Sequence, residues 1–387
     1  RQEVEQAHPV LVGLSVMSSM YLDTVYRVMD ALAPLHIPLA CGGAYATMFP
    51  QPLLEHGARF VIRSDGEIAL FRLVHALVSG GPWRDIPSLC FRDGDEVVLN
   101  PIGDVLSDVD GYGLPAVRCR DACFIDRDEL HRGDPQLSTR SYEVIASRGC
   151  PFTCSYCCCV NLRRLLPKGV PGVRTRSVDS VIRELIEAKN QCKNLVFVHF
   201  YDEIFPNLPG WVDEFTVAYA KHIHLPFTIW SHPKMVTPEL LEKLKKVGLT
   251  EVIMGIQSGS ERVRREVFHR YESQQDVIGA VRAIRDAGVW GSFDLMLQHP
   301  FETIPDLKAS YDLVKEFPTP YELQLHGLNF LPGTDIVDMA LEQGIYTPEE
   351  MNRVMYAPME TQFGAYWQRE TSQESQAWYE MIYCWQF

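Results

Sequence analysis

Three cysteines within a short stretch are the side chains of this sequence best suited to chemistry. Cys150, Cys154 and Cys157 are spaced C-x3-C-x2-C and follow a short apolar segment, Tyr142 to Ser147, that reads as a buried strand. Thiolates are the ligands that iron–sulfur clusters select, and three of them on a four-iron cluster leave one iron without a protein ligand. The spacing therefore predicts a 4Fe–4S cluster with one iron open to a further ligand.

Zinc and disulfides are the alternatives for these cysteines. A structural zinc site needs four ligands, usually as two pairs, and no second pair follows Cys157. Cys158 and Cys159 come next, but successive residues of an extended loop point in different directions. The cysteine count is odd, at 11, and the given residues contain no signal peptide, which disfavours a disulfide framework. The remaining cysteines are expected to be small buried residues or free thiols: Cys41, Cys90, Cys119, Cys123, Cys192 and Cys384.

The cysteine spacing, with the aromatic Tyr156 just before the last cysteine, resembles the radical S-adenosylmethionine (SAM) superfamily. In that family the open iron binds SAM, and an electron from the cluster cleaves SAM to a 5′-deoxyadenosyl radical. The resemblance implies that Cys150, Cys154 and Cys157 bind the cluster and that Tyr156 lies near the adenine of SAM.

Composition is consistent with a soluble enzyme. At 387 residues the chain should form about two domains. Its 36 basic and 50 acidic residues give a formal charge of −14, which disfavours nucleic acid as a partner. No apolar run is long enough to cross a bilayer, so we expect a cytoplasmic protein without a membrane span. Because the first residue is Arg1 rather than methionine, we expect that an upstream segment is missing.

Residues 141–335 alternate short apolar runs with amphipathic stretches, which is a βα pattern. The expected strands are 142–147, 194–200, 226–231, 251–256, 291–297 and 322–328. The expected helices are 178–190, 211–221, 238–247 and 274–287. Six βα units are too few for a closed eight-stranded barrel, but they fit the partial (β/α)6 barrel of radical SAM proteins, in which ligands gather at the carboxyl ends of the strands.

Two of the expected strand ends carry motifs that resemble family segments. Phe200 to Phe205 resembles F-x-D-D-x-F, so Asp202 or Glu203 is expected to accept hydrogen bonds from the SAM ammonium or ribose, unless they merely begin a solvated helix. Met254 to Arg262 resembles G-I-E-S-G-S-E-R, which implies SAM contacts from Gln257 and Ser258. Gln257 stands where the family usually has glutamate, so its contact to SAM should be weaker.

Three more segments of the expected barrel resemble family sequences less closely. His232 and Lys234 are possible contacts to the SAM carboxylate, although a surface lysine is the simpler interpretation of the latter. Gln298 to Thr303 resembles G-x-P-G-E-T, with Gln298 and Phe301 in place of glycines, and these larger side chains should narrow the mouth of the barrel. Leu331 to Thr334 matches a common family turn.

The first 100 residues indicate a Rossmann-like, doubly wound domain, with strands at Val10 to Val12, Ile37 to Cys41 and Phe60 to Arg63. It resembles the later part of the cobalamin-binding domain found in one large radical SAM subgroup. That resemblance implies that Ser15, Gly42 and Gly43 line the nucleotide tail of cobalamin, where a bulky side chain would keep the backbone from the ligand.

The family's cobalamin domain can carry a D-x-H-x-x-G sequence whose histidine binds cobalt, and no such sequence occurs in these 387 residues. Three explanations stay open. The first βα unit is missing from this chain, cobalamin is held without a histidine ligand, or the domain is degenerate and binds no cobalamin.

Two further regions complete the expected domain plan. Residues 101–140 are rich in Asp, Gly and Pro and are predicted to be a linker. Residues 336–387 are predicted to be a helical, aromatic extension. Most of its aromatic residues are expected in the core, closing the open side of the barrel, with a substrate cap as the alternative: Tyr366, Trp367, Trp378, Tyr379, Tyr383, Trp385 and Phe387.

Three functions are compatible with these features. The first is a cobalamin-dependent radical SAM methyltransferase acting on an unactivated carbon of a small-molecule or natural-product substrate. The second is a radical SAM enzyme of the same build that catalyses cyclisation or rearrangement. The third is a non-catalytic iron–sulfur protein, which the SAM-type motifs disfavour. The first two also require an external electron donor such as flavodoxin or ferredoxin.

Overall fold

The computed structural model describes residues 1–119, 121–359, 361–362 and 372–387. Contacts between Cα atoms divide the chain into two compact units, each built from separate stretches of sequence. Unit 1 comprises Arg1–Ser107, Phe152–Gly172 and Leu328–Glu370. Unit 2 comprises Asp108–Pro151, Val173–Gly327 and Thr371–Phe387. The loop that carries Cys154 and Cys157 therefore belongs to unit 1, whereas Cys150 belongs to unit 2.

Unit 2 contains a six-stranded sheet in which every neighbouring pair of strands is parallel. Its strands are β8 (Ser141–Val144), β11 (Phe197–Phe200), β12 (Phe227–Ser231), β13 (Leu249–Gln257), β14 (Trp290–Met296) and β15 (Glu322–His326). Their order is β15-β14-β13-β12-β11-β8, so the two edges do not pair and the barrel stays open. Each expected strand of the barrel overlaps one of these six, which confirms the α/β interpretation.

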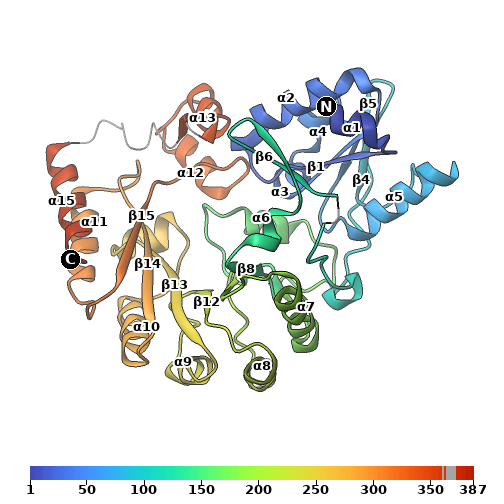
Figure 1. Ribbon diagram of the computed structural model, residues 1–387. Coiled ribbons are helices and arrows are strands. Elements are labelled where there is room, and N and C mark those ends of the chain that lie inside the picture. The colour runs from blue at the N-terminus through green and yellow to red at the C-terminus, as the bar shows by residue number, and fades with distance from the viewer. Residues whose placement is uncertain (120, 360, 363–371) are drawn as a thin grey trace. The chain divides into compact units, whose positions relative to one another are not determined.

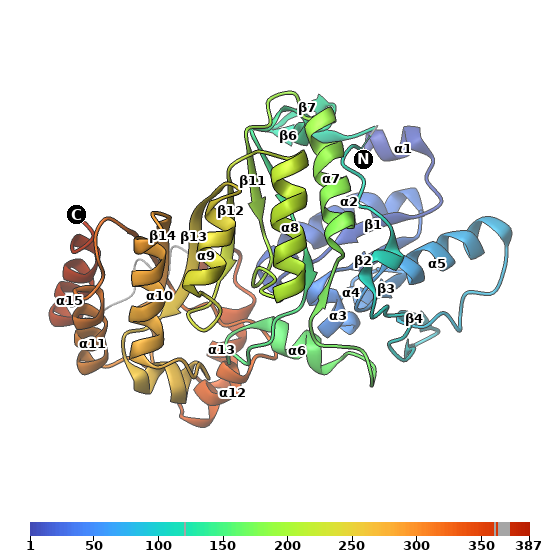
Figure 2. The same cartoon turned by 90° about the horizontal axis from the view of Figure 1, so that it is seen from below.

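Helices cover one face of this sheet. Figures 1 and 2 show α7 (Val178–Gln191), α8 (Pro209–His222), α9 (Pro238–Lys245) and α10 (Gln274–Asp286) in a row along it. Hydrogen-bonding N-caps fix where three of them begin, at Ser177, Thr237 and Ser273. Their apolar faces and the strands form one continuous core, which includes a cluster of aromatic rings between β11, β12 and α8.

The C-terminal aromatic residues only partly follow the expectation. α15 (Gln373–Cys384) lies beside α11 (Ile304–Val314), where Tyr379 is buried and the Trp378 ring is 5.5 Å from that of Tyr311. The expectation of core positions is wrong for Tyr383, Trp385 and Phe387, which are exposed: Tyr383 lies on the outer face of α15, and the other two follow its last turn. Tyr366 and Trp367 lie outside the described residues.

Two short antiparallel pairs complete unit 2. The hairpin of β6 (Cys123–Asp126) and β7 (Glu129–Arg132) lies within the segment expected to be a linker. The pair of β9 (Ser147–Arg148) and β10 (Arg174–Thr175) brings together the two ends of the segment that contains the cysteine motif. We call this pair the clip, because it closes residues 149–173 into a loop.

Unit 1 contains a five-stranded mixed sheet of order β1-β2-β3-β4-β5. Its strands are β1 (Val12–Ser15), β2 (Leu39–Gly42), β3 (Phe60–Ile62), β4 (Leu89–Asp93) and β5 (Glu96–Leu99). β1, β2 and β3 are parallel as expected, whereas β4 and β5 join as an antiparallel addition that the sequence analysis did not predict.

The helices of unit 1 pack on both faces of its sheet, as in Rossmann-like folds. Alternate residues of β2 point to opposite faces, so Leu39 and Cys41 share one core with α2 and α4, while Ala40 shares another with α5. The helices of this unit are α1 (Gln2–Ala7), α2 (Leu22–Leu32), α3 (Ala44–Met48), α4 (Pro50–Glu55), α5 (Glu67–Ser79), α6 (Cys158–Arg164), α12 (Asp335–Glu342) and α13 (Pro348–Met355). Within the described residues, no helix is both long and apolar enough to cross a membrane.

Candidate active site

The cysteine motif lies on the loop that the clip closes. Cys154 is buried and Cys150 and Cys157 are partly buried, and none of the 11 cysteines of the chain is in a disulfide. The Cys157 N–H donates to the Cys154 carbonyl at 3.2 Å, and α6 begins immediately afterwards with Cys157 as its N-cap. The last predicted ligand therefore lies at the N-terminus of α6, where the neighbouring Cys158 thiol and burial raise the pKa of the Cys157 thiol to about 11, so that binding of iron has to displace the thiol proton.

The donor set fits an iron–sulfur cluster rather than a single metal ion. Among the described residues, no three His, Cys, Asp or Glu side chains are grouped so that they could hold a metal ion. A cluster makes a different demand, because each thiolate binds a different iron. Three cysteines that are in no disulfide, spaced C-x3-C-x2-C along the chain, could each supply a thiolate to a different iron.

Helix α6 is fastened to the turn that follows the barrel sequence. Asn161 donates to the Gly333 carbonyl, and Arg164 forms a bidentate ion pair with Asp335 at 2.7 and 2.9 Å. The Ile336 N–H donates to the Ser155 carbonyl at 3.0 Å. All of these residues belong to unit 1. The family-like turn at 331–334 therefore supports the cysteine loop, a role that its sequence did not reveal.

Asp202 faces inward rather than towards a ligand. Its carboxylate accepts hydrogen bonds from the Ser147 N–H and hydroxyl, both at 2.6 Å, and from the Ala146 N–H at 3.2 Å, and the residue is 2% exposed. Burial raises the pKa of Asp202 to about 6, although these donors favour its anion. Glu203, its neighbour, is exposed. Of the two carboxylates in the motif, Asp202 is therefore buried and holds the protein's own backbone, whereas Glu203 lies at the surface.

The segment that follows β13 anchors its own loop. The Ser258 side chain is fully buried and accepts from the Ser260 N–H at 3.1 Å, and the Ser260 hydroxyl donates to Asp306 at 2.6 Å. The Arg262 guanidinium also binds Asp306 and, with the Ser260 hydroxyl, holds the pKa of that buried carboxyl well below its usual range. Ser260 therefore ties the loop to the start of α11, and the fully buried Ser258 side chain, which holds Ser260, leaves no surface for a ligand.

Gln257 differs from these anchoring residues. It is partly buried, has a φ of 71° and lies at an irregularity in the pairing of β13 with β14. A left-handed backbone conformation is uncommon at residues other than glycine. Where such a residue adopts it, the residue often lies at a functional site. Of the two SAM contacts predicted on this segment, Gln257 is the one whose position still suits a ligand.

His232 lies beside the buried ion pair of Arg270 and Glu272 at the end of β12, and because burial lowers the pKa of His232, the imidazole is the neutral member of this cluster. Its Nε2 lies 3.3 Å from a Glu272 carboxylate oxygen, and the Arg270 Nε donates to the other oxygen at 2.6 Å. Glu272 is fully buried, and despite that desolvation the His232 hydrogen bond and the Arg270 charge lower its pKa to about 2. Arg270 also donates to the Gly255 carbonyl at 2.6 Å. His232, predicted as a SAM contact, is buried beside Glu272, and Arg270 links this pair to the end of β13.

The loop after β14 contains a carboxyl group with an unusual environment. Glu302 accepts from the Gln298 N–H at 2.6 Å through one oxygen, and its other oxygen is buried without a hydrogen bond. Burial raises the pKa of Glu302 to about 8. Gln298 has a φ of 55°, which explains why glycine is usual in the segment that it resembles. Its side chain donates to Gln376 of α15 at 3.1 Å.

The predicted cobalamin residues lie together at the carboxyl ends of β1 and β2. Ser15 is exposed and is the direct partner of Gly42 across the two parallel strands. Gly43 has a φ of 104°, and a Cβ there would lie 2.7 Å from the Val16 carbonyl oxygen, so this position requires glycine. A Cβ on Gly42 would meet nothing nearer than 3.9 Å. A side chain could therefore be added at Gly42 without a clash, whereas Gly43 cannot carry one.

A small cavity of about 30 Å³ lies beside these strand ends within unit 1. Its walls come from the segment after β1, from α3 and from the turn at 331–332, and they include Ser18, Tyr45 and Cys158. Cys158 is the residue that follows the last predicted cluster ligand. The segments that follow β1 and β2 and the first residue of α6 therefore line one small cavity.

Comparison with known proteins agrees with this geometry. The profile of the radical SAM superfamily matches residues 144–314, which contain the three cysteines and the motifs at Asp202, Gln257 and Glu302. Residues 144–314 of the chain form a radical SAM domain.

Its relatives in this superfamily include cobalamin-dependent proteins. An uncharacterised methyltransferase of Pyrococcus horikoshii is 23% identical over 88% of this chain and 72% of its own. The radical SAM methyltransferase TsrM from Kitasatospora setae, solved with cobalamin and a 4Fe–4S cluster, superposes with a TM-score of 0.66 at 17% identity over 87% of this chain. The cobalamin-dependent radical SAM enzyme OxsB, solved with aqua-cobalamin, gives 0.72 at 13% identity over 98% of this chain.

These structures establish a shared fold. This chain spans 65% of the TsrM chain and 63% of the OxsB chain, so the relatives contain further sequence. The comparison confirms the fold class, which combines a Rossmann-like domain with a radical SAM barrel.

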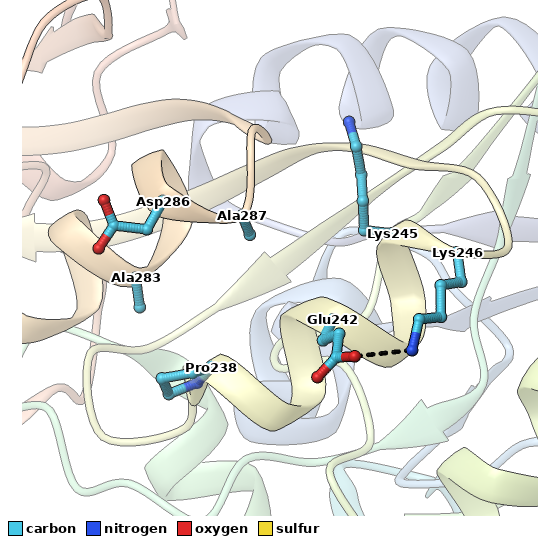
Figure 3. Close-up of a pocket in the computed structure, with 7 residues that line it drawn as sticks. All are labelled: Pro238, Glu242, Lys245, Lys246, Ala283, Asp286 and Ala287. Carbon is cyan, nitrogen blue, oxygen red and sulfur yellow. Dashed lines mark hydrogen bonds and ion pairs between the residues drawn. The ribbon is translucent and has the colours of Figure 1, made fainter.

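The groove drawn in Figure 3 is separate from the radical SAM site. It has a volume of about 430 Å³ and lies between α9 and α10, with Glu242, Lys246 and Asp286 among its lining residues. Lys246 pairs with Glu242 at 2.7 Å within α9. Both helices lie on the outer face of the sheet, whereas parallel barrels bind ligands at the carboxyl ends of their strands. The groove therefore has no part in binding the cluster or SAM.

Proposed function

We propose that this chain is a cobalamin-dependent radical SAM methyltransferase that acts on an unactivated carbon of a small molecule. One observation supports this most directly: residues 152–172, which carry Cys154 and Cys157, belong to the same compact unit as the cobalamin-type strand ends at Ser15 and Gly42. In addition, Cys158 shares a small cavity with the segments that follow these two strand ends.

The chain's own residues would hold the cofactors as follows. Cys150, Cys154 and Cys157 would bind the cluster, Tyr156 and Gln257 would contact SAM, and Ser15 with Gly42 and Gly43 would accommodate cobalamin. When bound, these groups supply a carbon-centred radical and a transferable methyl group, and the protein orients them and excludes water. Asp202, His232 and Ser258 would act indirectly, by holding the segments that carry the ligands.

Methyl transfer to cobalamin can be tested without the substrate. The protein is reconstituted anaerobically with iron, sulfide and cobalamin, reduced by flavodoxin or dithionite, and given SAM with a deuterated methyl group. We expect 5′-deoxyadenosine, S-adenosylhomocysteine and deuterated methylcobalamin by mass spectrometry.

Each product reports a different part of the proposal. Formation of 5′-deoxyadenosine without label in cobalamin would reject methyl transfer and favour cyclisation or rearrangement. If no product forms and no cluster absorbance develops, the chain is not a radical SAM enzyme.

Cobalamin binding can be tested with a side chain at Gly42. A Gly42→Val variant should fold, since its Cβ meets nothing nearer than 3.9 Å, but the added side chain should occupy the ligand's space. We expect affinity for hydroxocobalamin to fall about tenfold or more, equivalent to about 1.4 kcal/mol, in equilibrium dialysis.

The matched control is Gly13→Val in the neighbouring strand, where a Cβ meets nothing within 4 Å. It should bind cobalamin as the unchanged protein does. Equal affinity of the two variants would show that cobalamin does not lie against Gly42.

A further inference from the structure

The segment leading into Cys150 is held from two sides by opposite charges. On one side, the Asp202 carboxylate accepts from the N–H groups of Ala146 and Ser147. On the other, the Arg176 guanidinium donates to the Ile145 carbonyl at 3.0 Å, and the Arg176 N–H donates to the Ala146 carbonyl at 2.8 Å. The N–H groups of Ala146 and Ser147 therefore donate to a carboxylate, and the Ile145 carbonyl accepts from a guanidinium. Hydrogen bonds in which one partner is charged are the stronger class.

The two charged residues, Arg176 and Asp202, are themselves held in place by neighbouring side chains and by burial. Arg176 pairs with the buried Glu184 at 2.5 Å, and Tyr142 donates to the same carboxylate at 2.9 Å. The Trp211 indole donates to the Arg176 carbonyl at 2.7 Å. Asp202 is 2% exposed, directly after β11. The base of the clip is therefore attached to rigid elements of unit 2.

We propose that Asp202 is a positioning residue for the cluster, which holds the backbone of Ala146 and Ser147 so that Cys150 is presented in a fixed direction. Only Arg148 and Gly149 separate Ser147 from Cys150, and Gly149 has a φ of 90°, a turn that redirects the chain at the loop's entrance. A change in the orientation of the Ser147 peptide would therefore change the direction in which the Cys150 side chain is presented. This inference rests on the proposed function, because it takes Cys150 as a cluster ligand.

The role differs from that implied by the F-x-D-D-x-F resemblance, in which this carboxylate contacts SAM. Its oxygens are already occupied by three donors from Ala146 and Ser147, and burial leaves almost no surface for a ligand. The two roles can be separated in the absence of SAM, since a SAM contact cannot affect a cluster that has no SAM bound.

The decisive variant is Asp202→Asn, which keeps the size of the side chain but presents an N–H₂ group to N–H donors. Loss of a group bonded directly to a metal ligand typically weakens metal binding about 10–100-fold, and Asp202, which acts through the backbone before Cys150, should lie at the lower end of that range. We therefore expect anaerobic release of iron to a chelator, without SAM, to accelerate by about tenfold or more, with altered g values in the electron paramagnetic resonance spectrum of the reduced cluster. Ser147→Ala, which removes only the hydroxyl donor, should give a smaller change in the same direction.

The exposed neighbour provides the matched control, Glu203→Gln, which should leave iron release and the spectrum unchanged. If Asp202→Asn retains iron and spectrum but binds SAM more weakly, Asp202 contacts SAM and the inference is wrong. If Asp202→Asn does not fold, an effect of Ser147→Ala on iron release decides the matter, and no effect overturns the inference. If the unchanged protein takes up no cluster, it is the proposed function that fails.

Discussion

A Cys157→Ala variant should form no detectable 5′-deoxyadenosine under conditions in which the unchanged protein cleaves SAM. The thiol is one of three that would hold the cluster, and the cluster provides both the electron and the open iron that binds SAM. Enzymes accelerate their reactions by about 10⁶-fold or more, and a cofactor-dependent enzyme loses nearly all of this with its cofactor. The measurement is anaerobic SAM cleavage followed by chromatography, together with iron and sulfide per chain.

The neighbouring cysteines make this prediction specific. Cys159→Ala changes a thiol two residues away that lies outside the C-x3-C-x2-C spacing, and Cys192→Ala changes a buried cysteine in α7's C-cap. Both variants should keep their iron and their activity to within about twofold. Normal SAM cleavage by Cys157→Ala, or equal losses in all three variants, would rule out the assignment of the cluster ligands.

The largest effect on stability is expected for Glu272→Gln. Glu272 is fully buried between His232 at 3.3 Å and Arg270 at 2.6 Å, so neutralising it leaves a buried guanidinium without its counter-charge. Removing one partner of a buried ion pair typically costs about 3–5 kcal/mol. We expect the free energy of unfolding in urea at pH 7 to fall by about 3 kcal/mol.

The effect should depend on pH in a defined direction. The pKa of Glu272 is about 2 in the folded protein, against 4.5 for an ordinary glutamate. The stabilisation from its ionised form is therefore complete above pH 4.5 and is lost as the pH falls towards 2. The difference in unfolding free energy between the unchanged protein and Glu272→Gln should shrink over that interval.

An exposed glutamate serves as the comparison for Glu272. Glu239 is 77% exposed and pairs with Lys243 on the surface of α9, so Glu239→Gln should change stability by no more than about 0.5 kcal/mol. A Glu272→Gln variant as stable as Glu239→Gln would show that the buried cluster contributes nothing to the fold.

The sequence predicted the secondary structure of the barrel well, because its signals are local. Apolar runs between amphipathic stretches located all six strands, and side-chain caps such as Ser273 lie where the helical patterns begin. The β4–β5 addition in unit 1 was missed, as was the hairpin within the expected linker. Its strand β7, Glu129–Arg132, consists mainly of charged and exposed residues, which give no alternation to detect.

The roles of the side chains at the site were harder to predict from the sequence than the strands were. A motif specifies residue types and spacing, but not the direction in which each side chain points. Asp202 and Ser258 occupy family-like positions, yet their oxygens bind the protein's own backbone. The ionic cluster of His232, Arg270 and Glu272 joins residues from two separate segments, and only the folded sheet brings them together. Gln257 could be singled out from sequence only as a departure from the family pattern, whereas its left-handed backbone required the structure.

The clip limits how much of the chain a bound cluster would have to order. The pairing of β9 with β10 and the hydrogen bond from Arg176 to the Ile145 carbonyl bring together the two ends of the loop at 149–173. Bringing the ends of a loop together costs entropy. A cluster bound by this loop would therefore act on a segment whose two ends the protein's own backbone already joins.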